Sequence, residues 1–511
     1  MKNYWFVSRP KRKLIPVPEV FSAFMAHALN LEWKGQVGKH INFEDELEKQ
    51  GLKRKGDRRD QGGSGGRTYA SWLYSLGLFF NKDGKVHTTL AGEAIINGES
   101  PVKILKNQVL KFQYPSSYSI RSGVNIDRRF RIRPFRFILK LLLDERIRYL
   151  TEEELAKIVI TEAEDETDKC FNYIVERIIS FRESGDSILP KDFNLLYPSK
   201  SGVQSFDRTV AMLRDIANTY INWIEYTQLA TRVERELVII PGKESEIENL
   251  LNDSSKLLPR YEDEEYFQRR YGLDPWHRKD TRDLNNAYAV TADSIARKIV
   301  RAKFLSMATQ SPITTIDTPV IEKIYYSTGI THSLIEEELA SFVNGALDSF
   351  EASYYDMALK GREKAREFEI ATVELFNKAF GFKSEHVGDK GKHPDVLVLS
   401  SQYGGIIDTK AYASYSISND HKNRMIYNYI PTYQEECDNL QFFMYIAAGF
   451  SSTFDKQVKD LAKESGINGS GITVNNIIKL AREYSQNNWD HRQLKDLFQM
   501  NREIGRSDYI N

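Results

Sequence analysis

Cysteine is scarce in this sequence of 511 residues, which contains only Cys170 and Cys437. The two cysteines lie far apart and have none of the short spacings that zinc sites use. This argues against a disulfide scaffold and against a structural zinc site. So few cysteines suit a protein of the reducing cytoplasm, and we expect a cytoplasmic localisation.

Long hydrophobic runs are also absent. No stretch approaches the roughly 20 apolar residues that a membrane-spanning helix requires. Residues 1–5 lack the apolar core of a signal peptide. Hydrophobic residues make up 41% and charged residues 28% of the chain, which is typical of a soluble globular protein. The length predicts about three or four domains.

The sequence has no excess of charge, because 71 Lys and Arg residues balance 71 Asp and Glu residues. The charge is nevertheless unevenly distributed. Basic residues outnumber acidic ones by 14 to 8 in residues 1–70 and by 12 to 3 in residues 101–150, and acidic residues lead by 11 to 4 in residues 151–190. Basic segments can attract phosphates even in a neutral protein, which favours DNA binding. The alternative is chance clustering of charge on solvated faces.

Residues 67–89 have the sequence pattern of a helix followed by a β-hairpin. Large apolar residues recur at helical spacing within residues 69–76, and Asp83-Gly84 is a typical hairpin turn. This order is that of a winged helix, which lays one helix in the DNA major groove. The alternative is a small α/β domain that binds nothing. On the first interpretation, the side chains expected to contact DNA are Arg58, Arg59 and Arg67.

The pattern partly repeats in residues 207–241, where a long helical stretch precedes a second hairpin-like segment. We therefore expect a second winged-helix-like unit. Between the two units, residues 128–136 interleave arginines with aromatic residues. Such a segment suits a groove for the DNA backbone, and it equally suits an arginine-rich face that covers an apolar core. On the DNA-binding interpretation, the contacting side chains are Arg128, Arg129 and Arg131.

Two carboxylates and a lysine are close together in a predicted hairpin near residue 400. Asp395 precedes an apolar run, and after a short turn the next strand ends at Asp408, with Lys410 two residues later. Side chains two residues apart in a strand share a face, so Asp408 and Lys410 should point the same way and Thr409 away, into packing. Mg²⁺ usually takes one or two carboxylates. We expect Asp395 and Asp408 to bind Mg²⁺ and Lys410 to orient the attacking water.

A helix is predicted over residues 367–380, ending at Gly381. Glu374 on this helix is expected to add an outer carboxylate to the site through water. The uncharged residues 404–407 before Asp408 favour a buried strand, and an acidic helix before the hairpin is the order of Mg²⁺-dependent nucleases of the PD-(D/E)xK type. The alternative is an edge hairpin with a surface Asp–Lys pair that contributes little.

These residues resemble a known family. Residues 331–511 look like the cleavage domain of type IIS restriction endonucleases of the FokI kind, most specifically at residues 408–412. The resemblance implies that Asp395, Asp408 and Lys410 form the catalytic trio, with Mg²⁺ as cofactor. Residues 1–310 are similar, in scattered segments such as 111–116 and 266–272, to the recognition halves of the AlwI, MlyI and BstNBI group of type IIS and nicking enzymes. Such enzymes bind an asymmetric site as monomers and cut a few base pairs to one side.

The sequence departs from this resemblance in one helix. Residues 420–427 stand where the FokI kind carries charged contacts for transient dimerisation of the cleavage domain, and the charged positions do not match well. Double-strand cutting and nicking therefore stay open. The expected partners are double-stranded DNA, a second copy through the nuclease domain and, functionally, a cognate DNA methyltransferase. A DNA-binding regulator with an inactive nuclease fold is the third hypothesis.

The combined prediction is a multi-domain α+β protein. Two winged-helix-like DNA-recognition subdomains occupy residues 1–145 and 146–255, and a helical linker occupies residues 256–330. An α/β restriction-endonuclease-like domain occupies residues 331–511. The expected activity is that of a type IIS restriction endonuclease, which binds a short asymmetric sequence and hydrolyses the backbone outside it.

Overall fold

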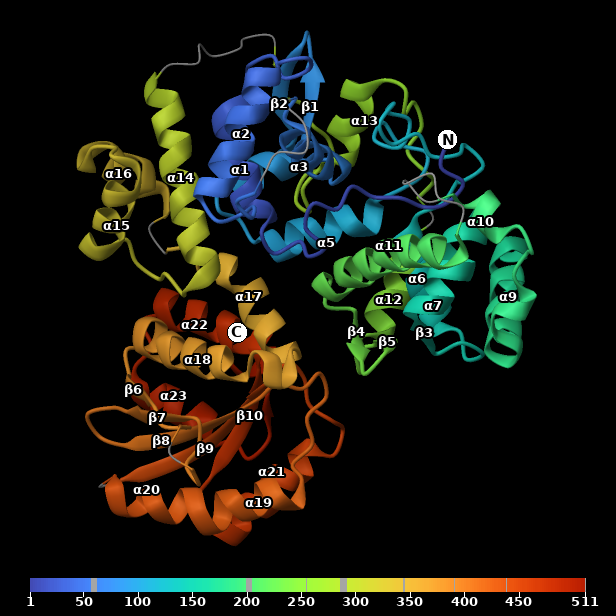
Figure 1. The fold of residues 1–511 in the computed structure, drawn as a ribbon. Coiled ribbons are helices and arrows are strands. Elements are labelled where there is room, and N and C mark those ends of the chain that lie inside the picture. The colour runs from blue at the N-terminus through green and yellow to red at the C-terminus, as the bar shows by residue number, and fades with distance from the viewer. Residues whose placement is uncertain are drawn as a thin grey trace. The chain divides into compact units, whose positions relative to one another are not determined.

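The fold was analysed in a computed structural model (Figure 1), which describes residues 1–56, 62–198, 205–253, 255–284, 292–342, 345–389, 391–437 and 439–510. The chain divides into two compact units. The first unit comprises Met1–Lys303 and Ile324–Glu338, and the second comprises Phe304–Lys323 and Leu339–Asn511. Within the described residues, no helix is long and apolar enough to cross a membrane.

The first unit begins with helices around a small hairpin. The hairpin strands pair antiparallel from Phe79 opposite Thr88 to Lys82 opposite Lys85. Asp83 and Gly84 in the turn both have positive φ, at 51° and 78°, as a tight hairpin turn requires. The expected order of helix and hairpin is therefore present. The elements are α1 (Val17–Ala28), α2 (Val37–Lys49), α3 (Ser64–Ser75), β1 (Phe79–Lys82), β2 (Lys85–Thr88), α4 (Leu90–Ile96) and α5 (Pro101–Lys111).

The middle of the first unit contains the second predicted helix and hairpin, together with a strand that the sequence did not indicate. β3 (Tyr149–Thr151) joins the hairpin in a three-stranded sheet of order β3-β5-β4. Thr151 caps the following helix in a complete capping box with Glu154, which the Thr-x-x-Glu spacing of the sequence favours. The other elements are α6 (Pro134–Leu143), α7 (Glu152–Glu154), α8 (Ile160–Glu162), α9 (Asp168–Ser184), α10 (Phe193–Leu196), α11 (Phe206–Tyr226), β4 (Ala230–Val233), β5 (Glu236–Ile239) and α12 (Glu244–Leu251).

One hydrophobic core runs through both predicted recognition subdomains. Its buried residues form a single packed cluster, and their positions in the sequence range from Tyr4 to Tyr271. The Tyr114 hydroxyl donates to the Phe6 carbonyl oxygen at 2.6 Å and lies 2.5 Å from the Tyr220 hydroxyl. These buried bonds join the N-terminal strand-like segment to α11. The expected boundary near residue 145 is therefore not a break in packing.

The segment predicted as a linker from residue 256 starts as packed structure. Helix α13 (Glu264–Tyr271) lies against β1, and Tyr271 donates its hydroxyl to the carbonyl oxygens of Ser75 and Gln108, each at 3.1 Å. Its helical character was expected, but its burial was not. Farther along, α14 (Ala292–Gln310) and α15 (Thr318–Thr328) each pass from one compact unit to the other, and α16 (His332–Leu339) follows.

The second unit is a six-stranded sheet between helices. The strand order is β11-β10-β9-β8-β7-β6; β6, β7 and β8 pair antiparallel, and β8 to β11 pair parallel. The strands are β6 (Lys383–His386), β7 (Val396–Leu399), β8 (Gly404–Lys410), β9 (Leu440–Ala447), β10 (Gly469–Thr473) and β11 (Glu503–Ile504). The helices are α17 (Leu347–Leu359), α18 (Ala365–Phe380), α19 (Asn419–Arg424), α20 (Ile430–Glu436), α21 (Phe454–Ser465), α22 (Val474–Gln486) and α23 (His491–Phe498).

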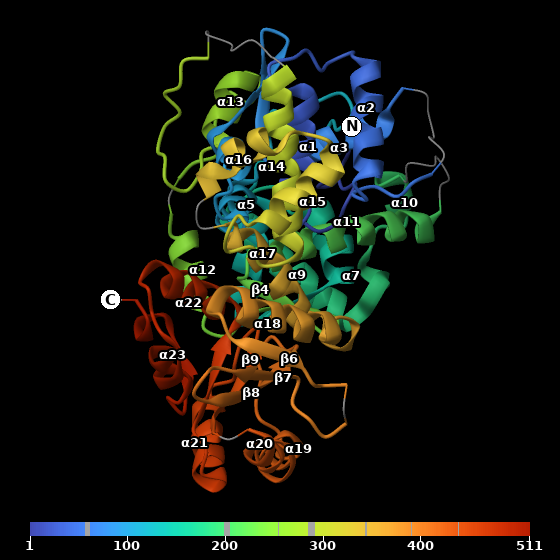
Figure 2. The ribbon, with the colours of Figure 1, turned by 90° about the vertical axis from the view of Figure 1, so that its left-hand side faces the viewer.

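Helices cover both faces of this sheet. Helices α18 and α23 pack on one face, where Phe376 and Phe442 both contact Phe498. Helices α20 and α21 cover the other face, over a core that includes Ile406 and Tyr445. Figures 1 and 2 show α18 on one side of the sheet and α19 and α20 on the opposite side. The predicted helix ends as expected at Gly381, which has a φ of 70°.

Candidate active site

Strand pairing brings the two aspartates of the hairpin together. β7 and β8 pair with Val396 opposite Ile407, so Asp395, just before β7, stands opposite Asp408 near the end of β8. The pairing of the two strands stops there, while β8 continues alongside β9 as far as Lys410. The end of β8 therefore has one unpaired edge, and Asp395 lies beside it.

Lys410 is placed against Asp408 by the strand periodicity. The Lys410 Nζ lies 2.7 Å from Asp408 Oδ2, and the two side chains are only 14% and 4% exposed. Asp408 follows Ile406 on the face of β8 that α20 and α21 cover. The shared face expected for Asp408 and Lys410 is present, and the ion pair is buried rather than on the surface.

Thr409 takes part in this group, and the expectation that it points away into packing is wrong. Its backbone N–H donates to Asp395 Oδ2 at 2.6 Å, and its hydroxyl donates to the same oxygen at 2.8 Å. The reason is the unpaired edge of β8. The last pair between β7 and β8 is Val396 opposite Ile407. The Thr409 N–H, two residues later in β8, therefore has no partner in β7 and donates to the Asp395 carboxylate instead.

The charges in this group shift one another's protonation. Burial raises the pKa of Asp395 well above its usual value, and the nearby carboxylates of Asp408 and Glu369 raise it further. For Lys410, burial opposes the charged form, but Asp408 and Asp395 outweigh it and raise the pKa. Two carboxylates crowded beside one ammonium leave an excess of negative charge. A divalent cation would relieve that excess.

The helix before the hairpin contributes Glu369 and not Glu374, so the placement expected for Glu374 needs correction. The Glu374 Oε2 accepts from Ser311 Oγ at 2.6 Å and lies 3.3 Å from Lys378 Nζ, away from the aspartates. Glu374 is five positions after Glu369, so their side chains point in directions about 140° apart around the helix axis. Only one of them can face Asp395.

Glu369 is held beside Asp395 by a histidine. Its Oε2 lies 2.6 Å from His386 Nε2 at the end of β6. Gly388 lies between these groups, because a Cβ there would come within 3.3 Å of Glu369 Oε2 and 3.4 Å of the Asp395 Cα. A glycine at this position lets the helix and the hairpin approach closely. The sequence alone assigned no role to Glu369 or His386.

Aromatic residues and a histidine complete the surroundings of Asp408 and Lys410. The Tyr415 hydroxyl lies 2.9 Å from His421 Nδ1. Burial, and then the charge of Asp408, raise the pKa of both Tyr415 and Tyr429. Burial and the charge of Lys410 lower the pKa of His421. Sequence reasoning missed these three residues, and their only signal was their position soon after Lys410.

The donor set at the site consists of oxygen atoms, which suits a hard cation such as Mg²⁺. Among the described residues, no cluster of three or more His, Cys, Asp or Glu side chains could hold a metal ion. Two carboxylates are nevertheless enough, because Mg²⁺ usually keeps water and substrate phosphate as its other ligands. The residues therefore fit this ion.

The arginines expected to contact DNA lie in different surroundings. Arg67 on α3 and also Arg128 and Arg131 are exposed. Arg129 is engaged within the fold, where its guanidinium pairs with Glu164 and donates to the Thr161 carbonyl oxygen at 2.9 Å. That arrangement matches the alternative of an arginine covering the core. Arg58 and Arg59 lie outside the described residues.

A comparison with protein families matches residues 329–505 to the FokI cleavage domain. The matched residues include the whole group of Asp395, Asp408, Thr409 and Lys410. The protein is accordingly a FokI-like, type IIS site-specific deoxyribonuclease.

Three solved structures are distantly similar to this FokI-like chain. A structure of FokI is 14% identical, covers 88% of this chain and 85% of its own, and has a TM-score of 0.29. A structure of FokI bound to DNA is 14% identical, covers 88% of this chain and 83% of its own, and has a TM-score of 0.28. The BpuJ1 endonuclease binding domain, in complex with modified DNA, is 14% identical over 56% of this chain and 90% of its own, with a TM-score of 0.32. No curated protein matches the chain. The assignment rests on the family match.

Proposed function

We propose that this FokI-like endonuclease binds a short asymmetric sequence in double-stranded DNA and hydrolyses the backbone a few base pairs outside it, with Mg²⁺ as cofactor. The observation that carries the proposal is the buried group of Asp395, Asp408 and Lys410, with the Lys410 ammonium 2.7 Å from Asp408. An inactive surface hairpin would have no reason to bury such a group, because burying charges is costly.

Asp395 and Asp408 would hold the metal ion. A bound Mg²⁺ lowers the pKa of its water and offsets charge on the phosphate. Thr409 fixes the Asp395 carboxylate with two hydrogen bonds, so the two carboxylates stay aligned. Lys410 orients the attacking water and stabilises the charge that develops on the phosphate. We assign Glu369 a positioning role through His386, in place of Glu374.

The recognition part of the proposal rests on the first unit. We propose that α3 with the β1–β2 hairpin and α11 with the β4–β5 hairpin act as winged-helix-like readers in subdomains 1–145 and 146–255. The nuclease domain then spans residues 331–511, after a helical linker. The exposed Arg67, Arg128 and Arg131 would contact the DNA, and Arg58 and Arg59 remain predicted contacts. The similarity to the AlwI, MlyI and BstNBI group likewise remains a prediction.

Whether the protein cuts one DNA strand or both depends on how many active sites act together, and we propose a single active site in each chain. One group of catalytic residues cuts one strand at a time, so double-strand cutting needs a second nuclease domain. The helix α19 carries an exposed ion pair between Asp420 and Arg424, at 2.8 Å, and is the surface proposed for a transient dimer. A nicking enzyme of the same build is the alternative. In a cell, a cognate DNA methyltransferase would protect the host sites.

Incubation of the protein with plasmid DNA and Mg²⁺, followed by run-off sequencing of the products, tests this function. The expected result is breaks at a fixed offset from one asymmetric sequence, in linear product. Open circles with breaks in a single strand would favour the nicking enzyme. Binding without any break would contradict the nuclease and favour a regulator. Omitting Mg²⁺ should abolish the breaks.

A further inference from the structure

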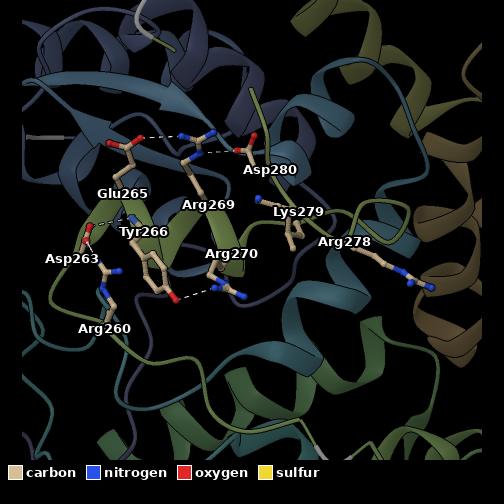
Figure 3. A pocket seen from close by; sticks show the side chains of 10 residues that line it. Arg260, Asp263, Glu265, Tyr266, Arg269, Arg270, Arg278, Lys279 and Asp280 are labelled. Carbon is tan, nitrogen blue, oxygen red and sulfur yellow. Dashed lines mark hydrogen bonds and ion pairs between the residues drawn. The ribbon is translucent and has the colours of Figure 1, made fainter. Parts of the chain in front are cut away.

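A charged pocket of about 500 Å³ opens in the first unit, beside α13 (Figure 3). It is formed by α13 and by the loops on either side of that helix. Ten residues line it: Arg260, Asp263, Glu265, Tyr266, Arg269, Arg270, Leu273, Arg278, Lys279 and Asp280. Nine of these ten side chains are polar or charged. Charged side chains therefore dominate its lining.

The carboxylates of the pocket already have basic partners. Asp263 pairs with Arg260 at 2.6 Å. Glu265 and Asp280 both pair with Arg269, each at 3.0 Å, and Asp280 also pairs with Arg282 at 2.8 Å. Figure 3 shows Arg269 between its two carboxylate partners. All three acids are thus neutralised inside the protein.

Three cations of the pocket have no such partner. Within the described part of the chain, Arg270, Arg278 and Lys279 form no ion pair with a carboxylate, and all three side chains are exposed. Arg270 donates to the Tyr266 hydroxyl, at 2.8 Å. The pocket therefore carries a local excess of positive charge in a chain whose net charge is zero. Such an excess attracts an anion.

One of these cations, Arg270, stands on an ordered helix. The Tyr266 ring lies between two guanidinium groups, with the Arg260 Cζ 4.0 Å and the Arg270 Cζ 5.3 Å from its centroid. Phe267 and Tyr271, on the inner side of α13, are 1% and 3% exposed. An ordered helix surface loses little conformational entropy when it binds a ligand.

The loop after α13 is anchored as well. Lys111 Nζ donates to the Leu273 carbonyl oxygen at 2.8 Å, and Asp274 accepts from the backbone N–H groups of Trp276 and His277 at 2.9 and 2.8 Å. This turn presents Trp276, which is 50% exposed, two residues before Arg278. An exposed tryptophan beside unpaired basic residues is typical of a nucleic-acid contact.

We propose that this pocket binds backbone phosphates of the duplex DNA, with Arg270, Arg278 and Lys279 as the phosphate contacts. The inference rests on the proposed function and adds a contact surface to it. Phosphate contacts fix the register of a protein on DNA and carry no sequence information of their own. The pocket would therefore hold the recognition unit on the duplex, while other side chains read the bases.

The test is DNA binding by the full-length protein without divalent metal, on a cognate duplex and on a random duplex, as a function of salt. Arg270→Ala and Lys279→Ala should each weaken binding to both duplexes roughly three- to tenfold and reduce the salt slope by about one. Arg270→Lys keeps the charge and should retain the slope. The matched control is Lys459→Ala, because Lys459 is exposed on α21, outside the elements assigned to DNA recognition.

Unchanged affinity and salt slope in both alanine variants would overturn the inference. Loss of binding on the cognate duplex alone would also overturn it, because that result indicates base reading. Thermal unfolding should match that of the wild-type protein, since both side chains are exposed. If the wild-type protein binds and cuts DNA while the variants bind equally well, only the pocket assignment fails. If the wild-type protein binds no DNA, the proposed function fails with it.

Discussion

Thr409 donates both its backbone N–H and its hydroxyl to one oxygen of Asp395, at 2.6 and 2.8 Å. Thr409 lies in β8 and Asp395 lies just before β7, and both lie beyond the last pair of the two strands, Val396 opposite Ile407. The Asp395 carboxylate thereby accepts the N–H that β7 leaves unpaired in β8, and the two hydrogen bonds from Thr409 hold the carboxylate in one position. The metal-binding aspartate of the proposed mechanism is positioned by the residue between Asp408 and Lys410.

Replacing Thr409 with Val should slow cleavage while leaving the fold intact. Valine keeps the shape and the backbone N–H but removes the hydroxyl that binds Asp395. A hydrogen bond to a charged group contributes about 1.5–3 kcal/mol, and one bond remains, so we expect about a tenfold lower single-turnover rate. Thr409→Ser retains the hydroxyl and should cleave close to the wild-type rate. Equal rates for Val and wild type would contradict this role for the hydroxyl.

The two glutamates of α18 should differ in their effect on cleavage. Glu374→Ala removes a half-exposed ion pair with Lys378, which contributes at most about 1 kcal/mol to stability, and should leave the rate nearly unchanged. Glu369→Ala frees His386 beside Asp395 and should lower the rate by roughly tenfold, because small displacements at a reacting centre are costly. Single-turnover cleavage measures both. A greater loss in the Glu374 variant would contradict the assignment.

The shared core of the first unit predicts that Tyr114 stabilises both halves. Tyr114→Phe removes the buried hydrogen bonds from Tyr114 to the Phe6 carbonyl oxygen and the Tyr220 hydroxyl, and should lower the free energy of unfolding by about 1–3 kcal/mol. The matched control is Tyr173→Phe, since Tyr173 is 49% exposed and its hydroxyl donates to Glu162 at the surface. Denaturant unfolding compares the two. Equal, small losses would argue against a single core.

Lys111 should make stability depend on pH. Burial lowers the pKa of Lys111 to about 7 in the folded protein, from an ordinary value of 10.5. Between these values the unfolded chain binds more protons, so stability rises with pH. The burial penalty is complete below about pH 7 and is relieved as the pH rises towards 10.5. Relative to Lys111→Met, the wild-type protein should gain about 1 kcal/mol per pH unit between pH 8 and 9.5 in urea unfolding. If the free energies of unfolding of the two proteins changed equally with pH, the lowered pKa of Lys111 would be contradicted.

The sequence predicted those parts of the site that depend on local periodicity. Alternation along a strand places Asp408 and Lys410 on one face, and hairpin pairing brings Asp395 opposite Asp408. The end of α18 at Gly381 and the capping box at Thr151 also follow from short local patterns. Each of these features involves residues close together in the chain.

The features that the sequence could not predict depend on how distant elements meet. Whether Glu369 or Glu374 faces the aspartates is set by the rotation of α18 over the sheet. The role of Thr409 depends on where β7 stops, which the apolar pattern of the hairpin does not mark. The burial of α13 requires its contact with β1, and the segment's charged residues hide its apolar side, Phe267 and Tyr271.

Cleavage and binding by Asp408→Ala, measured side by side with the wild-type protein, test the central claim most directly. The variant removes one proposed Mg²⁺ ligand and the partner of Lys410, and Asp460→Ala on the exposed face of α21 is the matched control. We expect the Asp408 variant to bind the specific duplex as tightly as the wild-type protein and to make no Mg²⁺-dependent breaks, while the control cuts normally. Cleavage by the Asp408 variant at the wild-type rate would contradict the account.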